Sequence, residues 1–203
     1  MKKYAVVSLL ATMLVALSAG SASAAPGQSF HIKLKGASAE ALWESTTATS
    51  FTDTDVLAEL NSPGGPSLFF DQFTGFDDGS SVEMFGTATD ASIAVSTKLT
   101  SASGVATVPV TVCTFDANGN GGCVDGGSVA VNAQWTGAGP LQHGVFNDHV
   151  TSKGSKFHDH FNGYRRDASA TATIGSQSLN ASTLLFAELF ISKEGISSLC
   201  HNC

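Results

Sequence analysis

Apolar and polar residues alternate with a period of two along much of the chain. Phe30, Ile32 and Leu34 alternate with polar residues, a pattern typical of a half-buried strand. The segment 105–115 is rich in β-branched residues and predicts a strand whose hairpin partner is 128–135. Pro109 lies inside it and predicts an edge strand or a β-bulge. Further strands are expected at 41–47, 49–60, 67–74, 81–87, 93–99, 145–147, 157–161, 168–174 and 183–191.

Turn sequences separate these segments at intervals of about 8–12 residues, the spacing of all-β domains. The clearest turns are 61–66, with two prolines and two glycines, and 75–79, with two glycines and two aspartates. Segments 53–60 and 184–190 also resemble helices, but the neighbouring Thr and Phe residues favour strands. The sequence predicts one all-β domain, an antiparallel β-sandwich with a jelly-roll-like arrangement.

The amino-terminal segment has the features of a secretory signal peptide. Lys2 and Lys3 form a basic start, 5–17 is largely apolar, and 22–24 is a small-residue cleavage site. The apolar run is too short to cross a bilayer as a helix. We therefore expect a signal peptide over 1–24, a single secreted, extracellular domain over 25–203, and no membrane span in the mature form.

The low content of charged residues and the negative net charge limit the classes of molecule that the protein is expected to bind. Charged residues are 13% of the chain, against roughly 25% in average globular proteins. The formal net charge is −7, and it becomes −9 once Lys2 and Lys3 are removed. Since no basic stripe is visible along the sequence, a nucleic-acid partner is not expected. A surface covered by Ser, Thr, Asn and Gly fits strands that meet a polysaccharide, a surface protein or another copy through poorly charged edges.

Aromatic usage points mainly to core packing. The chain has 13 Phe but only two Tyr and two Trp, and Phe has no polar group for a half-wet binding surface. Trp43 and Trp135 are expected to pack in the core. If exposed, they would instead form a stacking platform for a carbohydrate.

One segment resembles a known group of sequences. It includes Trp135-Thr136-Gly137-Ala138-Gly139-Pro140-Leu141, then His160-Phe161-Asn162-Gly163, then Arg166-Asp167-Ala168 followed by alternating Ala and Thr. Residues 131–173 resemble a loose group of uncharacterised secreted bacterial β-proteins. That resemblance implies a secreted all-β domain, and it transfers no catalytic residue.

Four cysteines in an exported chain predict two disulfides. Cys113 and Cys123 lie at the two ends of a Gly- and Asn-rich loop between predicted strands, so this pair is favoured. Cys200 and Cys203 would then form the second bond. The crossed pairings, which would tie the carboxy-terminus to the 113–123 loop, remain open.

The same loop suggests calcium. Asp116, Asn118 and Asn120 place oxygen ligands at alternate positions and Gly121 follows, as in the first half of an EF-hand loop. The position of the bidentate Glu is Gly127, so Asp125 would have to substitute. The alternative is an ordinary β-hairpin loop, in which Asn-Gly pairs supply positive φ.

Four histidines fall close together and suggest a transition-metal site for Zn²⁺ or Cu²⁺. His158 and His160 would project from one face of a strand. His143 or His149 would supply a third ligand if 141–150 pairs with 157–161. Asp148 and Asp159 would orient the imidazoles. The alternative is a solvated His-Asp-His loop.

No spacing in the chain indicates nucleophilic or paired-carboxylate catalysis. The leading hypothesis is a secreted, disulfide-bonded β-sandwich that binds or builds structure at the cell surface or in extracellular matrix, without catalysis. Two alternatives are a metal-binding protein or metal-dependent enzyme that uses the histidines, and a carbohydrate-binding module.

Overall fold

A computed structural model describes residues 29–62, 64–152 and 155–200, so the proposed signal peptide lies outside the described residues. The described chain contains strands, turns and no helix, which confirms the predicted all-β fold. The strands are β1 (Ser29–Thr46), β2 (Ser50–Ser62), β3 (Gly65–Phe76), β4 (Ser81–Ala88), β5 (Ser92–Val95), β6 (Ser101–Phe115), β7 (Gly121–Gly137), β8 (Gln142–Ser152), β9 (Ser155–Ile174), β10 (Gln177–Leu179) and β11 (Leu184–Cys200).

All strand pairs are antiparallel and belong to one sheet that closes on itself. The circuit runs β1–β2–β3–β4–β6–β7–β9–β11 and returns to β1. The closing contact joins β7 to the carboxy-terminal part of β9, from Val131↔Ile174 to Gly137↔Ala168. Opposite walls of this closed part face each other like the layers of a sandwich. For example, a Cβ added at Gly104 of β6 would lie 3.1 Å from the side chains of Ala58 and Leu68.

The core fills the inside of the closed part. Alternate residues of each strand point inward and are buried, as the pleat requires. Two large rings, Trp43 and Trp135, pack among many alanines, and Trp135 Nε1 donates a 3.0 Å hydrogen bond across the interior to the carbonyl oxygen of Glu40. Small residues on neighbouring strands leave the space that each indole needs.

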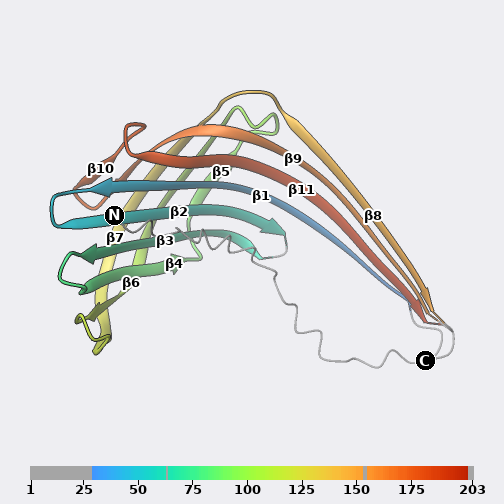
Figure 1. Cartoon of the computed structure of the whole chain (residues 1–203). Helices are drawn as coiled ribbons and strands as arrows, with labels where there is room; N and C mark the ends of the chain where they lie inside the picture. Colours follow the sequence, from blue (N-terminus) through green and yellow to red (C-terminus); the bar gives the residue numbers. More distant parts are fainter. Residues whose placement is uncertain (1–28, 63, 153–154, 201–203) are drawn as a thin grey trace, which may run out of the picture.

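Four strands continue beyond the closed part and form what we call the extension. It consists of residues 29–36 of β1, 142–152 of β8, 155–163 of β9 and 193–200 of β11, in the spatial order β8–β9–β11–β1. Figure 1 shows these strands running together, in a curved layer, away from β2, β3 and β4. The register does not shift within the extension, so each side chain keeps one face.

The strands differ from the sequence prediction mainly in length. Segments predicted as separate strands, such as 157–161 and 168–174, belong to the single strand β9. The two helix-like segments are strands, as favoured. Pro109 lies in β6, between β4 and β7, and the register shifts between Pro109 and Thr111. The bulge alternative is therefore right and the edge-strand alternative is wrong. Within the described residues, no helix is long and apolar enough to span a membrane.

Candidate functional site

The histidines predicted as metal ligands gather on one face of the extension. Odd-numbered residues of β8 and even-numbered residues of β9 continue the inward-facing positions of the closed part, and we call this side the inner face. His143, His149, His158 and His160 all lie on it and are exposed. The pairing of 141–150 with 157–161, which was the condition for a third histidine ligand, is present as the β8–β9 pair, which begins at Gln142.

The imidazoles do not converge on one point. His149 and His158 are direct cross-strand neighbours, with ring centroids 6.0 Å apart. His143 lies six residues from His149, about 20 Å along the strand, and stacks on Tyr164 at 4.5 Å. His160 hydrogen bonds to Asn147. In the part of the chain that the structure describes, no three His, Cys, Asp or Glu residues are grouped to hold a metal ion.

The expected orienting carboxylates also lie elsewhere. Asp148 and Asp159 pair with each other across β8 and β9, on the face opposite the histidines. The imidazole partners are instead Asn162 for His143 (3.2 Å), Thr151 for His149 (3.2 Å) and Asn147 for His160. Transition-metal binding thus stays a prediction, with His149 and His158 as the pair that the register brings together.

In the predicted calcium loop, the carboxylate of Asp116 accepts hydrogen bonds from other residues of the loop. Asp116 Oδ1 accepts from the backbone N–H groups of Asn118 (2.9 Å) and Asn120 (2.8 Å), and Oδ2 accepts from Asn120 Nδ2 (3.2 Å). These bonds, chiefly those from Asn120, lower the pKa of Asp116. Asp125 Oδ1 accepts from Gly127 N–H in a separate turn. The hairpin-loop alternative accounts for these contacts, and calcium binding stays untested.

The favoured disulfide is confirmed. Cys113 and Cys123 are directly opposite in the β6–β7 hairpin and form a bond between Cα atoms 4.0 Å apart. Cys203 lies outside the described residues, so the second predicted bond does too.

Removing this disulfide is expected to destabilise the domain. The bond closes a loop with a sequence separation of 10, and the chain-entropy model assigns such a loop about 3 kcal/mol. Urea denaturation of the variant Cys113→Ala/Cys123→Ala should show a loss of this order. A loss below about 1 kcal/mol would mean that the hairpin is equally constrained in the unfolded chain.

The alternative prediction, that Trp43 and Trp135 form an exposed stacking platform for a carbohydrate, is wrong. Trp43 and Trp135 are each only 1% exposed, inside the closed part. Because neither indole face reaches solvent, neither ring can stack on a sugar. The expected core packing of both rings is confirmed.

The outer surface of the closed part, on the side of the sheet away from the core, carries a set of carboxylates that the sequence did not predict. We call it the acidic face. In the closed part, four pairs of acids lie directly opposite each other on neighbouring strands, an arrangement that is destabilising when both members are charged. Apolar residues surround them; Leu42 and Phe85 flank the central pair. The acidic pairs are Glu40↔Glu188, Glu188↔Asp167, Glu44↔Asp53 and Asp55↔Asp71.

Burial and mutual repulsion perturb these groups. Burial, together with repulsion from Glu40 and Asp71, raises the pKa of Asp55 to about 7. Burial, with Glu83 and Asp53, raises the pKa of Asp71 to about 6. One oxygen of each of these two side chains is buried without a hydrogen-bond partner among the described residues. Sequence reading missed this face because its members come from separate strands.

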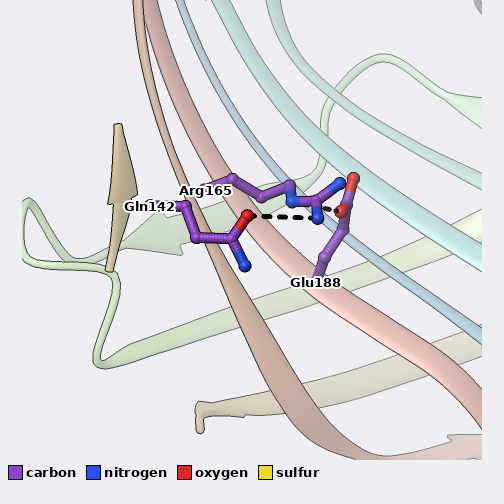
Figure 2. Close-up of polar contacts among 3 residues, drawn as sticks. All are labelled: Gln142, Arg165 and Glu188. Atoms are coloured by element: carbon purple, nitrogen blue, oxygen red, sulfur yellow. Dashed lines mark hydrogen bonds and ion pairs between the residues drawn. The ribbon is translucent and has the colours of Figure 1, made fainter. Parts of the chain in front are cut away.

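A single arginine partly balances the acidic face. Figure 2 shows Arg165 of β9 between Gln142 and Glu188, with Nη2 donating to Gln142 Oε1 at 3.3 Å and Nε 3.6 Å from Glu188 Oε2. Burial still raises the pKa of Glu188, although Arg165 lowers it. This contact joins β8, β9 and β11 where the extension leaves the closed part.

The extension also has an open edge. β8 pairs with β9 along Gln142–Ser152 and with no other strand in the described chain. Leu141, Val145 and Phe146 are exposed on or beside it (47%, 52% and 55%). The free N–H and C=O groups of such an edge can pair with another strand.

Comparison with known proteins gives no relative: no family model, no curated protein and no solved structure matches the chain. An all-β fold with the Cys113–Cys123 disulfide fits a structural β module. The resemblance of residues 131–173 remains an expectation.

Proposed function

We propose that the protein is a secreted structural module of the cell surface or extracellular matrix, which associates with further copies of itself through the open edge of β8. The observation that carries this proposal is the unpaired outer edge of Gln142–Ser152. Natural proteins commonly protect such an edge with several charges, a proline or a bulge. Here Asp148 is the one Asp, Glu, Lys or Arg residue of the strand, and the strand contains neither proline nor a register shift.

The partner strand is the same β8 edge of a second copy. Within the described residues, the other edge of the extension, residues 29–34 of β1, is open over six residues only, because β2 begins to pair at Lys35. A head-to-tail contact would therefore leave almost half of β8 uncovered. Two antiparallel β8 strands related by a two-fold axis match in length over all 11 residues and give a closed, symmetric contact.

A charged side chain on the open edge of β8 is expected to weaken the self-association of the protein. Val145→Lys adds an edge lysine of the kind that blocks strand pairing, and we expect the dissociation constant of the dimer to rise at least tenfold, about 1.4 kcal/mol. Sedimentation velocity of residues 25–203 over a range of concentrations measures it.

The matched control is Val105→Lys. Val105 is similarly exposed (45%), but it lies in β6, whose two edges there are occupied by β5 and β7. This variant should associate like the unchanged protein. Equal weakening by both substitutions, or a monomer at every concentration of the unchanged protein, would refute self-association through β8.

A further inference from the structure

The inner face of the extension gathers cations from segments far apart in the sequence. Lys33 and Lys35 come from β1, Lys156 from β9 and Lys193 from β11, and all four are exposed. They share the inner face because the register places Lys35 opposite Lys193, and Lys193 opposite Asn162 of β9. Together with the four histidines they form what we call the Lys/His face.

This face is unbalanced in charge, although the protein as a whole is acidic. The acids of the extension strands, Asp148, Asp159 and Glu194, alternate to the outer side. The described ion pair, Arg165–Glu188, also lies on the outer surface. Two lysines directly opposite each other cost stability unless an anion lies between them. Lys35 and Lys193 therefore form a pair for which the described protein supplies no carboxylate.

A hollow lies at this lysine pair, where the extension joins the closed part. It has a volume of about 310 Å³ and is lined by Lys35, Lys193, Ala37, Leu60, Ile191 and Asn61, among others. The apolar members offer a surface for the carbon face of a ring, while the two ammonium groups offer polar contacts. A hexose ring that carries a carboxylate matches this combination.

The rest of the Lys/His face is suited to hydroxyl groups. Asn147 and Asn162 lie between the histidines, and their amides already hydrogen bond to the imidazoles of His160 and His143. Such side chains donate and accept in turn. Both arginines of β9 are engaged elsewhere, Arg165 with Glu188 and Arg166 with the carbonyl of Gly139. Lysine without arginine favours separate carboxylates over the bidentate contacts that phosphodiesters receive.

We infer that the Lys/His face binds an acidic polysaccharide whose charge comes from uronate carboxylates, with one uronate held between Lys35 and Lys193. This surface is distinct from the β8 edge proposed for self-association and does not depend on it. It also differs from the tryptophan platform, because recognition rests on charge and hydrogen bonds instead of stacking.

The test uses alginate oligosaccharides, a pure polyuronate, with calorimetry on residues 25–203. The unchanged protein should bind, and its affinity should fall as salt is raised because both partners are charged. The double variant Lys35→Gln/Lys193→Gln should bind at least tenfold more weakly. It should also melt at the same or a higher temperature, because the substitution relieves the repulsion between the two lysines.

The matched control is Lys98→Gln, in an exposed turn between β5 and β6; it should bind alginate like the unchanged protein. Neutral dextran and double-stranded DNA are the comparison ligands and should bind more weakly than alginate. Equal affinity of the double variant and the unchanged protein would overturn the inference. So would tighter binding of DNA than of alginate, or equal binding of dextran.

Discussion

Replacing Trp135 with alanine is expected to lower the free energy of unfolding by about 4 kcal/mol, since large-to-small changes at buried Trp or Phe cost about 3–5 kcal/mol. The indole lies inside the closed part and is 1% exposed. Its cross-strand neighbours on the two sides are Ala102 and Ala170, which are too small to fill the space it would leave. Urea denaturation followed by far-ultraviolet circular dichroism measures the loss.

Two milder variants separate packing from hydrogen bonding. Trp135→Phe keeps most of the apolar volume but removes the 3.0 Å hydrogen bond to Glu40, leaving that carbonyl to find another donor. Trp43→Phe is the matched control, because Trp43 is equally buried but its Nε1 has no hydrogen-bond partner among the described residues. We expect Trp135→Phe to cost more, by about 1–2 kcal/mol. Equal losses would mean that the bond across the interior contributes nothing measurable.

Replacing Asp55 with asparagine is expected to stabilise the protein at pH 8, on the order of 3 kcal/mol. Burial, Glu40 and Asp71 raise the pKa of Asp55 to about 7, from an ordinary value of 3.8. Each unit corresponds to about 1.4 kcal/mol, and relaxation around the charge reduces the total. The asparagine side chain would retain the shape of the aspartate and carry no charge at any pH.

The direction of the expected effect follows from how the stability of the protein depends on pH. Between about pH 4 and 7 the folded protein binds a proton at Asp55 that the unfolded chain has released, so stability falls as pH rises and is then constant above 7. Asp71, with a pKa of about 6, adds to the same fall. The unchanged protein should therefore be less stable at pH 8 than at pH 5, and Asp55→Asn should reduce that difference.

Asp77→Asn serves as the control for this series. Asp77 is exposed in the turn after β3, so its substitution should leave the slope of stability against pH unchanged. If the unchanged protein gains stability from pH 5 to 8, or if Asp55→Asn destabilises it at pH 8, then the carboxylates of the acidic face are compensated by contacts other than those described.

Local patterns in the sequence predicted the elements that depend on neighbours in the chain. The 105–115 and 128–135 segments form the β6–β7 hairpin, and Cys113 pairs with Cys123, because a short turn fixes the register of the two strands. The pairing of 141–150 with 157–161 entered only as the condition for a third histidine ligand, and β8 and β9 do pair along these residues. The bulge at Pro109 follows from its missing N–H.

Features that depend on the pairing of strands far apart in the chain could not be predicted from the sequence. The pair Asp55↔Asp71 requires the β2–β3 register, and Lys35↔Lys193 requires two strands that are more than 150 residues apart to lie side by side. A shift of one residue in either pairing would move these side chains to the other face. The spread of the four histidines along the inner face was not visible for a related reason, since the register places His143 opposite Tyr164 and not beside His158.

Hydrogen–deuterium exchange of the β8 amides at low and high protein concentration tests the proposed self-association most directly. If the open edge of β8 meets a second copy, alternate amides of Gln142–Ser152 that do not bond to β9 will exchange more slowly at high concentration. Amides of β6 near Val105, already paired on both sides, will exchange equally at both. The proposal is contradicted if the protein associates while the β8 amides exchange at the same rate at both concentrations.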